Sequence, residues 1–572
     1  MNAGTSAVAV RGSSFRETAW AALLLAMCSL SIALIVPPTD ELPHCDDWDY
    51  VETARHFVST GRIVYSDWPT TTLLTHVLWG SGFAAIFGDS YLVFRSSMFV
   101  MSWLGACGLF LWCRCAGWRW GPAFWVAALF TFNPLTITYE YSFMTDATGI
   151  TATIWLGLLL HQFALRSKGG VGLGIFGGVA YLARQTAVVP LISYFALVGL
   201  RGLWKRKISR QAVLIGLAFA PFPIGYWLWL HVQGTPYASA WQERRGLPPF
   251  RELAERLAIL LLGSALYLSP MLIGLWSRER FRTLWKGVAA WAALIVVIVA
   301  SCGRWPAAYE RQEVFDFGVG FSDSIVERQH LYGPVVTVAG QELSVFTLVT
   351  SLLALLSLFA ACQLFAADWG ESRTRRDADD REFVRRWLMP LSTAILVALL
   401  CIVPTMHGRY VWPVSVLVLL CLTSRFADLG TSVPWVGVVL VAAFGAFGMV
   451  GIQDNSVSQQ TIWTALSDLE AQGIAPLEIN GGLEYGGVRR FEPLYRGPDH
   501  RGPYLEKLGS VERDRHIVLF NPINIFAPAR KYSVTYGPLP GNEIVREIPF
   551  HSWLRSGKIY VLRRNAPVDR GR

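Results

Sequence analysis

The sequence predicts an all-α polytopic membrane protein with about thirteen transmembrane helices and a small α/β domain at its C-terminal end. Hydrophobic residues make up 53% of the 572 residues and charged residues only 16%, which is too apolar for a soluble enzyme. Residues 18–36 carry no charge and nearly reach the ~20 helical residues that cross the hydrocarbon core. This stretch is long for the hydrophobic part of a signal peptide, so we expect it to remain as the first span.

Apolar stretches bounded by charged or turn residues define the other spans. The thirteen predicted spans are residues 18–36, 91–113, 121–138, 146–165, 171–186, 187–200, 211–231, 257–277, 285–302, 344–367, 387–404, 410–424 and 433–451. Several of these spans are shorter than ideal. The number of spans is therefore predicted only to within one or two.

Basic residues set the predicted orientation. With a cytoplasmic N-terminus, the loops at 201–210, 278–286 and 373–386 are cytoplasmic, and together with the N-terminal tail they carry about twice as many Lys and Arg as the loops opposite. This places the loop at 37–90, and everything after Gly451, on the extracytoplasmic side. The net charge of +9 is explained by these loops beside lipid head groups and does not indicate nucleic acid.

Composition divides the chain into a transmembrane region, 1–451, and a soluble extracytoplasmic domain, 452–572. The domain is richer in polar residues, Gly and Pro, and its runs at 517–520 and 558–562 are typical of strands. All nine Cys lie at or before Cys421, with no spacing typical of a disulfide framework or a metal site. We expect a small α/β fold for this domain.

Four polar features fall on the extracytoplasmic side of this topology. They are the HCDDWDY stretch at 44–50, the YEYSFMTD stretch at 139–146, Arg184-Gln185-Thr186 between two apolar segments, and His407-Gly408-Arg409-Tyr410 after Pro404. Residues just after the first stretch have the apolar spacing of a short interfacial helix.

Taken singly, most of these features have a plain structural interpretation. Asp146 suits a helix cap, Arg409 suits a side chain that snorkels to the interface, and the Asp46-Asp47 pair suits a solvated loop. Arg184 is harder to explain, because a guanidinium between apolar segments needs an anion or a cavity. Since all four features would have to be idle on the same side, we interpret them as one site.

The order of these motifs resembles the GT-C superfamily of polyprenyl-phosphate-sugar-dependent glycosyltransferases. It is similar in particular to the protein O-mannosyltransferase and lipid A aminoarabinose transferase branches. The order is an Asp-Asp-x-x-Tyr after the first span, an outer turn ending in Thr-Asp, an Arg-Gln, and an Arg-Tyr-x-x-Pro before the last spans. The resemblance covers the chain to about residue 451 and implies the GT-C type of helical membrane fold.

The resemblance also implies roles for individual residues. Asp46, Asp47 and Asp146 would be the catalytic carboxylates, and the substrate-binding residues would be Tyr50, Arg184, Gln185, Arg409 and Tyr410. The family has Glu where this chain has Asp47; the shorter side chain leaves open which Asp acts. The implied reaction is inverting hexosyl or pentosyl transfer, with an Asp as the general base for the acceptor hydroxyl and arginines that hold the leaving phosphate.

The implied partners are a polyprenyl-phosphate sugar donor, membrane lipids, and an acceptor that is an envelope lipid such as lipopolysaccharide, a glycan or a protein. The implied location is the bacterial inner membrane. The chain has no P-loop, Rossmann glycine pattern or zinc helix, so we expect no required cofactor and no metal site; a divalent cation has no support in the sequence.

Two other classes of protein stay open. A secondary transporter or lipid flippase would have internal pseudo-symmetry and ionisable residues near the bilayer midplane. A catalytically silent scaffold would tolerate loss of Asp46 and Arg184.

Overall fold

The computed structural model describes residues 15–44, 46–65, 73–166, 169–206, 209–233, 248–276, 285–302, 340–372, 380–403, 408–426, 430–491, 531–538, 541–553 and 556–565. Most of the described residues are helical. Parts of the predicted features lie outside them, namely Cys45 of the acidic stretch, 207–208, 278–284 and 373–379 of the basic loops, 404–407 before Arg409, and the predicted strand at 517–520.

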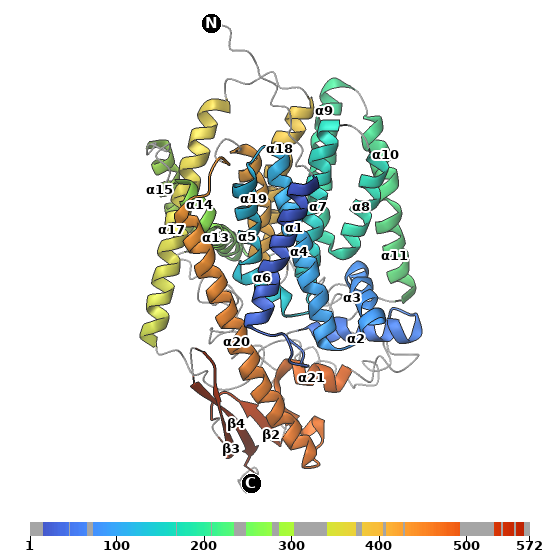
Figure 1. Cartoon of the computed structure of the whole chain (residues 1–572), viewed down its shortest axis with the longest axis vertical. Helices are drawn as coiled ribbons and strands as arrows, with labels where there is room; N and C mark the ends of the chain where they lie inside the picture. Colours follow the sequence, from blue (N-terminus) through green and yellow to red (C-terminus); the bar gives the residue numbers. More distant parts are fainter. Residues whose placement is uncertain are drawn as a thin grey trace.

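The chain is a multi-pass integral membrane protein built from a bundle of apolar helices (Figure 1). The helices of the bundle are α1 (Phe15–Ile35), α4 (Tyr91–Cys115), α5 (Trp120–Thr131), α6 (Pro134–Glu140), α7 (Thr145–Arg166), α8 (Gly170–Ala183), α9 (Val189–Lys205), α10 (Arg210–Phe219), α11 (Pro221–Gln233), α13 (Phe250–Tyr267), α14 (Ser269–Trp276), α15 (Trp285–Cys302), α17 (Gly340–Ser372), α18 (Asp380–Ile402), α19 (Val411–Arg425) and α20 (Trp435–Ala471).

Every predicted span falls on a helix or a pair of helices. Fewer than thirteen of these helices, however, are long enough to cross a membrane. In the described part of the chain, eight segments are long and apolar enough to cross a membrane, and the pair α13–α14, bent by 64°, makes nine. Helices α5, α8, α15 and α19 are shorter than the ~20 residues that a full crossing needs. Thirteen spans would require all four of these short helices to cross as well.

The sequence explains several points at which helices begin, bend or are interrupted. Pro134 begins α6 after Asn133, whose side chain accepts a hydrogen bond from the Leu135 N–H over 3.1 Å. Pro270 lies in the first turn of α14, at the bend from α13. Between α8 and α9 the chain forms a short 3-10 turn, η1 (Gln185–Val188). This is the predicted interruption after Arg184.

Two further helices lie at one end of the bundle, together with the C-terminal domain. They are α2 (Asp47–Thr60) and α3 (Leu74–Phe87), from the loop predicted to be extracytoplasmic. In Figure 1 both lie at the lower end of the bundle, on the same side as the C-terminal sheet, whereas the α9–α10 connection lies at the upper end. The acidic loop and the C-terminal domain therefore share one end of the molecule.

Within its described residues, the C-terminal domain has a four-stranded sheet with the order β1-β2-β4-β3. Its strands are β1 (Ile479–Asn480), β2 (Tyr532–Thr535), β3 (Asn542–His551) and β4 (Ser556–Arg564), and only the β1–β2 pairing is parallel. The predicted strand at 558–562 lies within β4. Helix α21 (Gly482–Phe491) and the end of α20 complete a separate hydrophobic core that includes Leu466, Tyr485 and Val561.

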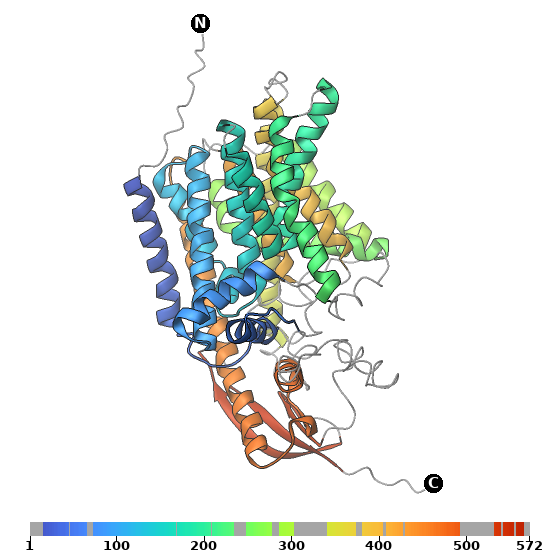
Figure 2. The ribbon, with the colours of Figure 1, turned by 90° about the vertical axis from the view of Figure 1, so that its right-hand side faces the viewer.

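Helix α20 joins the bundle to this domain without a break. It runs for 37 residues from Trp435 to Ala471 and passes straight through residue 451, where we expected the transmembrane region to end. Figure 2 shows its far end beside the sheet. The domain is thus joined to the bundle through a continuous helix.

Candidate functional site

The predicted helix after the acidic motif is α2. It begins at Asp47, with Asp46 at the N-cap position, and ends at Thr60, before Gly61, whose φ of 71° is the left-handed conformation that favours glycine. Asp47 and Asp49 occupy the first turn, where negative charge is stabilised by the helix dipole. The side chains from Asp47 to Tyr50 are all buried, whereas Asp46 is partly exposed. The two neighbouring acids therefore have different environments.

Asp47 ties two loops together. Its Oδ1 accepts a hydrogen bond from the His44 N–H over 2.7 Å, and its Oδ2 accepts one from the Phe143 N–H over 3.2 Å. Burial raises the pKa of Asp47 to about 7, although Arg95, His44 and the two N–H donors act in the opposite direction. Asp47 thus joins the loop before α2 to the loop before α7.

Tyr50 is connected to α7 through His76, a residue that the sequence analysis did not select. The ring of His76, on α3, lies edge-on to Tyr50 with centroids 5.5 Å apart and stacks on Phe143 at 4.1 Å. Its Nδ1 is 2.9 Å from the Thr148 hydroxyl on α7. A lone His in an apolar stretch was the available signal, but that pattern is more often structural, and this His76 packs between helices.

Arg184 and Asp146 come together where the end of α8 lies beside the start of α7. Arg184 follows the last residue of α8 in an extended conformation, and its Nη1 lies 2.8 Å from Asp146 Oδ1 and 3.1 Å from the Thr145 hydroxyl. Asp146 is 1% exposed, in the first turn of α7. Gly149 leaves room for the arginine, because a Cβ there would lie 2.5 Å from Arg184 Cδ. The anion that this guanidinium was expected to need is supplied by the chain itself.

Arg409 and Tyr410 complete the cluster. They lie on the 3-10 turn η3 (Gly408–Tyr410), just before α19. Both guanidinium groups lie near the Tyr410 ring, with Cζ of Arg184 5.8 Å and Cζ of Arg409 6.0 Å from its centroid. The Tyr139 hydroxyl donates to the Arg409 carbonyl over 2.9 Å and connects the turn to α6. Three of the four predicted features thus meet in one cluster.

Gln185 takes a different direction. Its Nε2 donates to the Tyr226 hydroxyl on α11 over 3.3 Å, so it links η1 to a neighbouring helix. Within the described residues, no three His, Cys, Asp or Glu side chains are grouped as metal ligands would be. That the protein has no metal site stays a prediction.

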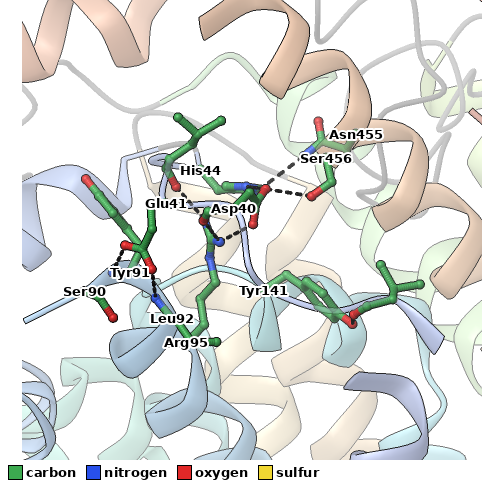
Figure 3. A network of polar contacts seen from close by, with 12 residues as sticks. Asp40, Glu41, His44, Ser90, Tyr91, Leu92, Arg95, Tyr141, Asn455 and Ser456 are labelled. Atoms are coloured by element: carbon green, nitrogen blue, oxygen red, sulfur yellow. Dashed lines mark hydrogen bonds and ion pairs between the residues drawn. The ribbon is translucent and has the colours of Figure 1, made fainter. Parts of the chain in front are cut away.

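A second polar network lies beside α2 and was not predicted (Figure 3). Its centre is the ion pair of Asp40 with Arg95, whose side chain on α4 is fully buried. Asp40 Oδ2 also lies 2.9 Å from His44 Nε2 and accepts a hydrogen bond from the Ser456 hydroxyl over 2.7 Å. Burial alone would raise the pKa of Asp40, but His44, Arg95 and Ser456 together hold it well below its usual range. The overlooked signal was Arg95, a charge inside a predicted span.

Comparisons with known proteins give a distant structural similarity. No family model matches this chain, and no curated protein matches its sequence. The apo crystal structure of ArnT from Cupriavidus metallidurans matches with a TM-score of 0.38 and 14% identity, over 96% of this chain and 98% of that chain. The structure of the same protein bound to undecaprenyl phosphate matches with a TM-score of 0.37 and 14% identity, over 97% and 99%.

ArnT is a lipid A aminoarabinose transferase, which is one of the branches that the order of motifs resembles. The similarity extends along nearly the whole chain at low sequence identity. Because both TM-scores are below 0.5, neither an activity nor the role of any residue is transferred from ArnT to this chain.

Proposed function

We propose that this protein is a membrane glycosyltransferase of GT-C type, which moves a hexose or pentose from a polyprenyl-phosphate donor to an envelope lipid, glycan or protein. The observation that supports the proposal is the cluster of Asp146, Arg184, Arg409 and Tyr410, assembled from three separate segments of the chain. The proposal includes thirteen membrane crossings, an extracytoplasmic site and C-terminal domain, and a bacterial inner-membrane location.

The cluster contains residue types that suit a phosphate site. The guanidinium groups of Arg184 and Arg409 both lie within about 6 Å of the Tyr410 ring centroid, and Arg184 is paired with Asp146. In the proposal these two arginines hold the donor phosphate, which arginine binds with charge-assisted and often bidentate hydrogen bonds. Asp146 fixes the direction of the Arg184 side chain, so its role in the proposal is to orient the arginine that holds the donor.

Asp46 is the better candidate for the general base. Both oxygens of Asp47 accept backbone hydrogen bonds, and its side chain is fully buried, whereas Asp46 is partly exposed at the start of α2. In the proposed step the acceptor hydroxyl gives its proton to Asp46 and its oxygen forms the new bond to the anomeric carbon. The bond from that carbon to the phosphate oxygen breaks, and the polyprenyl phosphate leaves with the electron pair. A single displacement of this kind inverts the anomeric centre.

The first test is identification of the lipid that the protein holds. The purified protein in lipid nanodiscs is extracted and its lipids are identified by mass spectrometry; a polyprenyl phosphate, depleted in the Arg184→Ala variant, is the expected result. Transfer from a panel of polyprenyl-phosphate sugars to envelope lipid extracts then identifies the acceptor class. Vesicles that move a lipid across the bilayer but transfer no sugar would instead indicate the flippase class.

A further inference from the structure

The segment from Asp40 to Trp48 lies between the bundle and the C-terminal domain. On the domain side, α20 contributes Ser456, which donates to Asp40 over 2.7 Å, and Asn455, whose Nδ2 is 3.4 Å from His44 Nδ1 (Figure 3). Leu42, from the same segment, packs against the hydrophobic core of the C-terminal domain. This part of the chain is therefore in contact with residues more than 400 positions later.

A second contact holds the other end of the segment. Trp48, in the first turn of α2, has no exposed surface, and it packs on α21 at Gly487. A Cβ at position 487 would lie 2.5 Å from Trp48 Cζ2 and 2.7 Å from its Nε1, distances that real Cβ atoms do not show. The indole of Trp48 can approach this closely only because residue 487 has no side chain. The adjacent Gly486 has nothing within 4 Å of the same virtual atom.

We infer that the C-terminal domain positions the candidate base, by holding the chain on both sides of Asp46. His44 is in contact with α20, Trp48 is in contact with α21, and Asp46 is between them in the sequence. Asp47 adds a direct connection, because it accepts the His44 N–H. The inference rests on the proposed function, and it makes Trp48 and Gly487 positioning residues that need not touch substrate.

Positioning of this kind has a measurable consequence for turnover. A general base must lie within hydrogen-bond reach of the proton it accepts, and a displacement of about 1 Å can cost about 10²-fold in rate. The phosphate cluster of Arg184 and Arg409 belongs to other segments. Loosening α2 should therefore reduce turnover while binding of the donor phosphate is retained.

The two neighbouring glycines provide a matched pair of variants. Gly487→Ala adds one methyl group against Trp48, and Gly486→Ala adds the same group on the same helix in open space. We expect amide hydrogen exchange in 46–60 to be about tenfold faster in Gly487→Ala than in Gly486→Ala. Farnesyl phosphate binding should be equal in the two variants, while turnover falls about 10–100-fold in Gly487→Ala alone.

A compensating substitution separates positioning from misfolding. Trp48→Phe removes the outer part of the indole, so Trp48→Phe/Gly487→Ala should recover most of the exchange protection in 46–60. If Gly487→Ala does not fold, Asn455→Ala/Ser456→Ala removes the α20 contacts without adding atoms, and exchange in 46–60 should still increase about threefold. Equal exchange in all variants and the wild type would overturn the inference. If hydrogen exchange in 46–60 increases in the variants but the wild-type protein transfers no sugar, the contacts of the C-terminal domain with this segment are supported and the proposed function is rejected.

Discussion

Arg184 Nη1 and Asp146 Oδ1 lie 2.8 Å apart and connect the end of α8 to the first turn of α7. The carboxylate is almost fully buried, whereas the arginine side chain is 16% exposed. The pair is therefore open on the arginine side only. A phosphate that reaches Arg184 meets a guanidinium whose direction is already fixed, which reduces the ordering cost of binding.

Arg184→Ala should lose donor binding and also some stability. The substitution removes the phosphate contact and leaves Asp146 buried without its cation, which we expect to cost about 1–3 kcal/mol, below the value for a fully buried pair because Arg184 is partly exposed. Arg184→Lys should recover part of the binding, since lysine keeps the charge but not the planar fork. Calorimetry with farnesyl phosphate and thermal unfolding check both effects. Unchanged binding by a folded Arg184→Ala protein would remove Arg184 from the donor site.

Asp46→Asn and Asp47→Asn should have different effects. If Asp46 accepts the acceptor proton, Asp46→Asn should lower turnover about 10²–10⁴-fold and leave donor binding intact, because Asn preserves size but does not take the proton. Asp47→Asn should be milder in turnover, since Asp47 holds backbone N–H groups and the amide oxygen can keep part of that role. Transfer rates at saturating donor decide the matter. Inactive Asp47→Asn beside active Asp46→Asn would move the base by one residue.

The raised pKa of Asp47 predicts how the stability of the folded protein changes with pH. Its pKa is 3.8 in the unfolded chain and about 7 in the folded protein, so between these values the folded protein binds more protons than the unfolded chain. The stability associated with this proton is complete below pH 3.8 and is lost as pH rises through 7. Asp47→Asn has no such proton, so its melting temperature should rise relative to wild type between pH 5 and pH 8. A constant difference across that range would contradict the raised pKa.

The sequence predicted most helices of the bundle because their signals are local. Apolar runs marked each predicted span, and Arg184 between two such runs marked the break that η1 forms. The number of spans was less well determined, because α5 and α19, at 12 and 15 residues, are too short to be distinguished from buried or partial helices by composition.

The sequence could not predict which residues far apart in the chain are in contact. The partner of Arg95 is Asp40, 55 residues earlier, and Ser456 on α20 reaches the same carboxylate from 416 residues away. Arg95 itself was visible as a charge in a span, but nothing local identifies its partner. The contact of Trp48 with Gly487 is equally hidden, since a glycine in a short helix has many explanations.

Asp40→Asn should be strongly destabilising. Arg95 is fully buried, and the loss of its counter-ion leaves a buried charge satisfied mainly by the carbonyls of Asp40 and Leu42, which we expect to cost about 3–5 kcal/mol. Ser456→Ala removes one hydrogen bond to the same carboxylate and should cost about 1–2 kcal/mol. Denaturation of the two purified variants and the wild type measures how much stability each variant loses. Equal losses would mean that the ion pair contributes little beyond the hydroxyl.

The orientation of the whole molecule is the prediction on which the site depends most. The α9–α10 connection, which carries Lys205 and Arg210, lies at the opposite end of the bundle from α2 and the C-terminal sheet (Figure 1). The positive-inside rule predicts that the basic end is cytoplasmic, so we expect α2 and the domain to face outward, where a lipid-linked donor would present its sugar. Fusions of alkaline phosphatase and of green fluorescent protein after Lys205 and after Arg572 should therefore give opposite results, with phosphatase active only at Arg572 and fluorescence only at Lys205. The same result at both points would reject this orientation and, with it, an extracytoplasmic role for Asp46.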